Sequence, residues 1–166
     1  KGFFVARTET NSDNAIYAQI FMLKPSRAQR RMVQIIEAAI RNYTTHGIEK
    51  TTYDSIAKTC KISRPLIQHY FKNKEEIFEM AMKYIRAQYQ NYTIQRLKGQ
   101  TEPKERLIAY VDAAVEWVFE FPQYQRVWNL FFYACGVQPK LRRLNTELVS
   151  MGHDRITAFL EEGAAK

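Results

Sequence analysis

Residues 52–70 of the chain read TYDSIAKTCKISRPLIQHY, and this stretch decides the fold class. It divides into two short helical segments, 52–60 and 64–70, separated by a link of three residues. Thr52 and Ser63 stand where N-caps are expected, and the proline in the first turn of the second segment replaces an amide that would lack an intrahelical partner. Two short helices linked this tightly are typical of a helix-turn-helix unit.

The second short segment has one apolar side and one polar side. Ile67 and Phe71 lie four residues apart, so both are expected to face inward, against Ile56, Ala57 and Ile62. The side chains left on the exposed side or at the N-terminal tip are Arg64, Leu66, Gln68, His69 and Tyr70. A short helix with this exposed set offers contacts to base edges and to phosphates in a DNA major groove.

Longer helices are expected on both sides of this unit. Residues 26–46 repeat apolar side chains at the spacing of one helical face, and Ser26 with Gln29 forms a capping box at the start. Asn73 with Glu76 indicates a second capping box, which opens a long helix over 74–96. The helix at 26–46 and the two short helices together form the arrangement of a three-helix DNA-binding unit.

The remaining sequence is also expected to be helical. Residues 103–121 are apolar nearly all round, which predicts a central, buried helix. Residues 124–135 are rich in aromatic side chains, and 140–162 show the pattern of a last amphipathic helix. Strand-like alternation with turn residues does not occur, so we predict an all-α fold.

The predicted organisation has three parts. Residues 1–25 form an N-terminal arm or a short helix over 14–23, residues 26–73 a homeodomain-like helix-turn-helix domain, and residues 74–166 a helical ligand-binding and dimerisation domain. The charge supports this division. Residues 24–100 carry 15 basic and 6 acidic residues, whereas residues 101–166 carry 8 basic and 9 acidic ones. A basic module joined to a nearly neutral one suggests a polyanion-binding head, with a solvated basic face as the alternative.

Composition and motifs argue against several other classes of protein. His46, His69 and His153 are isolated from metal-ligand spacings, and glycine-rich phosphate loops and nucleophile elbows do not occur, so we expect no enzyme, metal or cofactor. Apolar stretches of about 20 residues are also missing, and membrane insertion is not expected. Cys60 and Cys135 lie in unrelated contexts, which favours reduced thiols and a cytoplasmic location.

Residues 30–78 resemble the N-terminal domain of TetR-type regulators almost without gaps. The resemblance rests on Ala38, Ala39, Tyr43 and Gly47 in the first helix, on the pairs Thr51-Thr52, Ile56-Ala57 and Ile62-Ser63, and on HYFKNKEE at 69–76. It implies a DNA-binding transcriptional regulator, a repressor by default, that acts as a homodimer on a palindromic operator. A small apolar or aromatic effector bound in the second domain would release the DNA.

The residues expected to contact DNA follow from the exposed side of the unit and from the resemblance. They are Thr52, Tyr53, Ser63, Arg64, Pro65, Leu66, Gln68, His69, Tyr70 and Lys74. Arg64 is the expected base reader, with a solvated arginine as the alternative, and the free amides of the helix that follows Thr52 suit a backbone phosphate. The resemblance implies a phosphate contact for Lys74. His69 and Leu66 remain open between DNA contact and packing.

The sequence departs from the TetR pattern at three places. Lys61 stands in the turn where the family usually has glycine, which predicts a strained backbone there. Gln68 stands where an aromatic residue is common. The family also usually has two further helices, which form the dimer interface, after the one that ends near Gly163. We therefore expect either a fragment or a protein with another way of pairing.

The second domain supplies candidates for the effector site. We expect Tyr84, Tyr110, Trp117, Phe121, Trp128 and Phe131 to line it, although aromatic side chains at helical spacing are more often plain core. Three other functions remain open. The chain could be a helical small-molecule or partner-binding protein whose basic head no longer reads a specific DNA sequence, an activator, or a protein that binds membrane surfaces.

Overall fold

The computed structural model describes residues 26–165, and all seven elements in that range are α-helices, which confirms the all-α prediction. They are α2 (Arg27–Lys50), α3 (Tyr53–Cys60), α4 (Arg64–Tyr70), α5 (Lys74–Leu97), α6 (Pro103–Glu120), α7 (Pro122–Val137) and α8 (Pro139–Ala164). The arm or short helix expected within residues 1–25 lies outside the described residues. Within 26–165, no helix combines the length and apolar character needed to cross a membrane.

Capping side chains set the starts of the helices. The Ser26 hydroxyl accepts from the Gln29 amide at 3.1 Å while the Gln29 side chain accepts from the Ser26 amide at 2.7 Å, so the first predicted capping box is confirmed. The second forms only in part. Asn73 accepts from the Glu76 amide, but the Glu76 carboxylate reaches one residue further back and accepts from the Lys72 amide.

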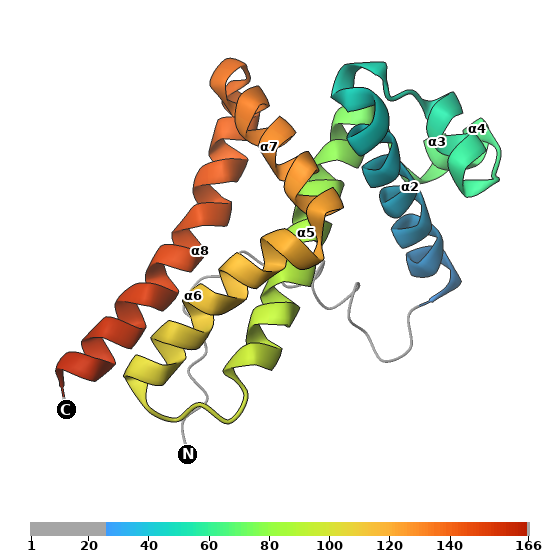
Figure 1. The fold of residues 1–166 in the computed structure, drawn as a ribbon. Helices are drawn as coiled ribbons and strands as arrows, with labels where there is room; N and C mark the ends of the chain where they lie inside the picture. The colour runs from blue at the N-terminus through green and yellow to red at the C-terminus, as the bar shows by residue number, and fades with distance from the viewer. Residues whose placement is uncertain (1–25, 166) are drawn as a thin grey trace.

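The helices gather into two groups that α5 connects. Figure 1 shows α2, α3 and α4 at one end and α6, α7 and α8 at the other, with α5 running between them. Helix α2 packs against α3, α5 and α7, so the first group touches the second directly as well as through α5. A single cluster of buried side chains extends from Ile35 in α2 to Leu148 in α8. Both cysteines are buried and unpaired.

Helix α6 is not buried all round, so that prediction was wrong. Its inner face, with Tyr110, Ala113 and Trp117, is buried against α5, α7 and α8. Its outer face exposes an apolar stripe of Ile108, Val111, Val115, Val118 and Phe119, with exposed fractions from 40% to 78%. An apolar helix surface is unfavourable in water, so burial is expected from the sequence. The sequence of the helix does not identify the element that buries each face. The described helices cover one face only.

Candidate nucleic-acid interface and ligand pocket

Helix α4 is anchored from behind by two apolar side chains. Ile67 and Phe71 are both 0% exposed and belong to the same buried cluster as Ile56 and Ala57 of α3, as predicted. Ile62, in the link, packs against this cluster. The rest of this short helix is largely open to solvent. Arg64, Pro65, Gln68 and His69 are exposed there.

The link between α3 and α4 contains the backbone strain that the sequence predicts. Lys61 has φ 54° and ψ 46°, in the left-handed region, and is the one non-glycine residue with positive φ among those described. A side chain in this region carries a steric cost that glycine avoids. The amides of Lys61 and Ile62 both donate to the carbonyl of Ala57, so this conformation ends α3 and turns the chain toward α4.

Arg64, the expected base reader, lies at the N-terminal tip of α4. Its Nη1 is 3.1 Å from Oδ2 of Asp54 on α3, and its guanidinium carbon lies 5.8 Å from the ring centroid of Tyr53. The side chains of Arg64 and Asp54 are 52% and 68% exposed, so the ion pair is worth at most about 1 kcal/mol. Asp54 therefore orients Arg64 without preventing an exchange for another partner.

The other residues expected at the DNA lie around α4. The Thr52 hydroxyl accepts from the Ser55 amide and thereby caps α3, while Ser63 precedes α4 without a side-chain capping bond. Tyr53, Leu66 and Tyr70 are half-buried. Lys74 is exposed as the first residue of α5. The structure thus brings together the tip of α3, the outer side of α4 and the start of α5.

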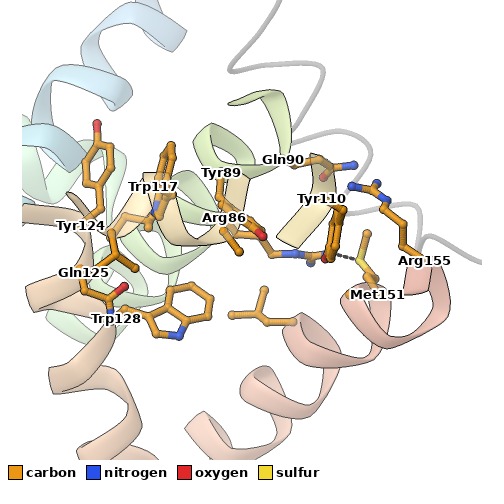
Figure 2. A pocket seen from close by; sticks show the side chains of 15 residues that line it. Arg86, Tyr89, Gln90, Tyr110, Trp117, Tyr124, Gln125, Trp128, Met151 and Arg155 are labelled. Atoms are coloured by element: carbon orange, nitrogen blue, oxygen red, sulfur yellow. Dashed lines mark hydrogen bonds between the residues drawn. The ribbon is translucent and has the colours of Figure 1, made fainter. Parts of the chain in front are cut away.

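A pocket of about 260 Å³ lies among α5, α6, α7 and α8 (Figure 2). Of the six aromatic residues expected there, Tyr110, Trp117 and Trp128 line it. The other three lie elsewhere. Phe131 is fully buried in the core, Tyr84 faces α2, and Phe121 packs behind Trp117 with ring centroids 4.2 Å apart.

Several lining residues were not expected from the sequence. They are the aromatic Tyr89 and Tyr124 and the polar or sulfur-containing Arg86, Gln90, Gln125, Met151 and Arg155. Sequence reasoning missed the polar and sulfur-containing residues because only aromatic side chains were considered, and it missed the two tyrosines because helical spacing does not show which aromatic side chains face a cavity. One signal was available for Arg86, which shares a helical face with the buried Met82 and Thr93 and is itself only 7% exposed.

A chain of contacts connects the pocket to α2. Tyr124, on the pocket wall, stacks on Trp117 with centroids 5.6 Å apart and lies edge-on to Tyr84 at 6.4 Å. The Tyr84 hydroxyl donates to Oε1 of Glu37 on α2 at 2.8 Å. Burial and this hydrogen bond raise the pKa of Tyr84 well above its usual value. The hydroxyl therefore stays protonated and keeps donating to Glu37.

Comparisons of sequence point to bacterial regulators. Residues 35–81 match the family described as bacterial regulatory proteins, tetR family. The HTH-type transcriptional regulator BetI of Burkholderia cenocepacia (strain HI2424) is 28% identical over 124 residues, which are 74% of this chain and 64% of that protein. BetI of Paraburkholderia phymatum is 29% identical over 124 residues. The chain thus spans somewhat less than two thirds of the length of these relatives.

Solved structures share the fold. A transcriptional regulator from Pseudomonas aeruginosa PAO1 has a TM-score of 0.74 at 18% identity, covering 89% of this chain and 71% of that one. A regulator from Saccharomonospora viridis, solved in complex with choline, has a TM-score of 0.73 at 19% identity, covering 82% of this chain and 71% of that one. The chain is therefore similar to the tetR family of bacterial regulatory proteins over residues 35–81, and it shares its helical fold with these regulators beyond that segment.

Proposed function

We propose that the chain is a sequence-specific DNA-binding transcriptional regulator, acting as a repressor, whose hold on DNA changes when a small molecule occupies the pocket. The observation that carries the proposal is the anchoring of α4, in which Ile67 and Phe71 are buried while Arg64, Gln68 and His69 face outward. A helix presented in this way fits a major groove, with its N-terminal residues at base edges. The surplus of basic residues between 24 and 100 supports binding to a polyanion.

The roles of the DNA-facing residues are part of this proposal. Arg64 reads a base, most simply a guanine through two hydrogen bonds. Lys74 and the start of α3 at Thr52 and Tyr53 bind backbone phosphates. Ser63, Pro65, Leu66, Gln68, His69 and Tyr70 complete the contact surface. Residues 26–73 then form the reading head and residues 74–166 the effector-binding and pairing domain.

Arg64 and Lys74 are expected to respond differently to alanine substitution. After selection of a preferred duplex from random DNA, Arg64→Ala should lose discrimination at one base pair, about 1–3 kcal/mol or ten- to hundredfold. Lys74→Ala should weaken binding to all duplexes alike. It should also reduce the slope of log affinity against log salt concentration by about one, because about one counterion fewer is released. Equilibrium binding to the selected duplex, its single-base variants and random DNA at several salt concentrations measures both.

The control variant is Lys104→Ala, which removes another exposed lysine charge, at the start of α6. It should change none of these affinities. Equal losses on every duplex for Arg64→Ala would show that Arg64 reads no base. A wild-type chain that binds selected and random DNA equally, with steep salt dependence, would favour the alternative of a helical binding protein with a non-specific basic head.

Coupling between pocket and DNA is proposed to run through α5 and Tyr84. Helix α5 begins at Lys74, separated from the end of α4 by three residues, and contributes Ile85, Arg86, Tyr89 and Gln90 to the pocket wall. Tyr84 connects this helix to Glu37 on α2 and lies against Tyr124 of the wall. A ligand that shifts these side chains would shift the reading head, and by linkage DNA binding would alter the pocket.

Tyr84→Phe is expected to weaken this coupling. The two tryptophans of the chain, Trp117 and Trp128, both line the pocket, so their fluorescence reports on it. DNA binding should change this fluorescence in the wild type, and Tyr84→Phe should reduce the change by roughly half or more because the contact to Glu37 is lost. The exposed Tyr133→Phe serves as the control. A full response in Tyr84→Phe would exclude this route.

A further inference from the structure

The pocket has chemically different ends. Figure 2 shows the guanidinium groups of Arg86 and Arg155 on the side of Tyr110 and Met151, whereas the rings of Trp117 and Trp128 lie toward the opposite side. Contacts agree with this view. Arg86 donates to the Met151 sulfur, and the Arg155 guanidinium carbon lies 5.9 Å from the Tyr110 ring centroid. One end is therefore cationic and the other aromatic.

Among the described residues, the charged side chains on the pocket wall are both arginines. Arg86 and Arg155 both line the pocket, and the lining residues within the described part of the chain include neither aspartate nor glutamate. Arg86 is 7% exposed and Arg155 is half-buried, so both charges act in surroundings with less water than the surface. A charge placed between them would interact more strongly than at an exposed site. The wall favours an anion and disfavours a cation.

Neutral polar groups surround the cationic end. Burial raises the pKa of Tyr89 to about 12, so its hydroxyl remains a donor at neutral pH. The Gln90 amide oxygen is buried and has no hydrogen-bond partner among the described residues. Because an amide offers either its oxygen or its NH₂ after rotation by half a turn, Gln90 can serve a carboxylate or a hydroxyl beside it. This end is suited to a polar, charged ligand group.

We propose that the pocket binds a small organic acid with an aromatic or similarly flat apolar body. The carboxylate lies between Arg86 and Arg155, and the body lies against Trp117 and Trp128. A cavity of about 260 Å³ suits a compact ligand, since pockets for drug-sized molecules start near 300 Å³. The inference rests on the proposed function, because it assigns a chemical class to the proposed effector.

This class differs from that of the choline bound to the Saccharomonospora viridis regulator. That protein is 19% identical to this chain, which shows a common fold and not a common ligand. Aromatic walls alone would suit a quaternary ammonium group. In this chain, however, such a cation would share the pocket with two guanidinium groups. The guanidinium groups repel such a cation, and this repulsion favours an organic acid as the ligand.

Three probes that share a phenyl ring and differ in charge test the proposal. They are phenylpropionate, its neutral amide phenylpropionamide and the cation phenylpropyltrimethylammonium. Binding to the full chain is followed by calorimetry and by the fluorescence of Trp117 and Trp128. The acid is expected to bind about ten- to hundredfold more tightly than the amide, because charge-assisted hydrogen bonds to arginine are lost in the amide. The ammonium compound should bind most weakly.

Substitutions assign the preference to the two arginines. Arg155→Gln should reduce the preference for acid over amide to about threefold or less, because one of the two cations is gone. Arg86→Gln should have the same effect. Substitution of Arg155 is less able to disturb folding, because Arg155 is only half-buried. The control Arg143→Gln removes an exposed arginine of α8 that does not line the pocket, and it should keep the full preference.

The results separate this inference from the proposed function. The acid assignment would be overturned if acid and amide bound equally, if the ammonium compound bound more tightly, or if none of the three probes bound. An unchanged preference for acid over amide in both arginine variants would overturn it as well. Selected-duplex binding is measured on the same preparations. If the acid preference holds while the chain shows no sequence-specific DNA binding, the proposed function fails and the ligand class stands.

Discussion

The Phe71→Ala variant is expected to lose about 3–5 kcal/mol of its free energy of unfolding. Phe71 is completely buried at the end of α4 and packs in the cluster that also contains Ile67 and Ile56. Truncation leaves a cavity that the close-packed surroundings can fill only in part, and within the seven residues of α4 only Ile67 is fully buried. Since domains of this size are stable by about 5–15 kcal/mol, the loss is large.

Urea unfolding followed by circular dichroism measures this loss, and binding to the selected duplex should fall at least in parallel. The control is Tyr133→Ala, which removes an aromatic side chain that is 79% exposed and should change stability by no more than about 0.5 kcal/mol. A loss below about 1 kcal/mol for Phe71→Ala would mean that α4 is not held by this side chain. The presentation of Arg64 would then need another explanation.

Val115→Asp is expected to separate a homodimer into monomers. We propose that a second copy of the chain covers the apolar stripe of α6. Helix α8 contributes Ile156, which lines a shallow, almost purely apolar groove with Val115 and Val118. The proposed DNA-binding function would place two reading heads on successive major grooves if the chain pairs in this way, and a contiguous exposed apolar surface is typical of an interface.

In a two-fold symmetric interface one substitution places two aspartates, so the dissociation constant should rise about a hundredfold or more. Sedimentation equilibrium measures it. The control Val137→Asp changes an exposed valine at the end of α7, away from this groove, and should leave the dimer intact. A wild-type chain that sediments as a monomer at micromolar concentration, or a Val115→Asp variant that stays dimeric, would exclude this interface.

Local sequence was sufficient for the helices and for the register of α4. The residues that start helices, Ser26, Thr52 and Asn73, act through side-chain bonds to amides three positions away, and such bonds need no tertiary partner. The spacing of Ile67 and Phe71 likewise decides which side of α4 is buried, because four residues bring side chains back to one face. Arg64 lies three residues before Ile67, so its exposure follows from its place at the N-terminal end of α4 and not from this spacing.

Only the tertiary structure decided what the long apolar helices face. Trp117 and Val115 lie two residues apart in the same apolar helix, yet Trp117 is buried on the pocket wall and Val115 is 55% exposed. Hydropathy could not separate them, because burial depends on which other helix lies opposite. For the same reason the spacing of Arg86 from Met82 indicates a shared helical face but not the pocket wall on which Arg86 lies. The pocket forms only where four helices pack together. The pattern of a single stretch of sequence does not specify how those helices pack.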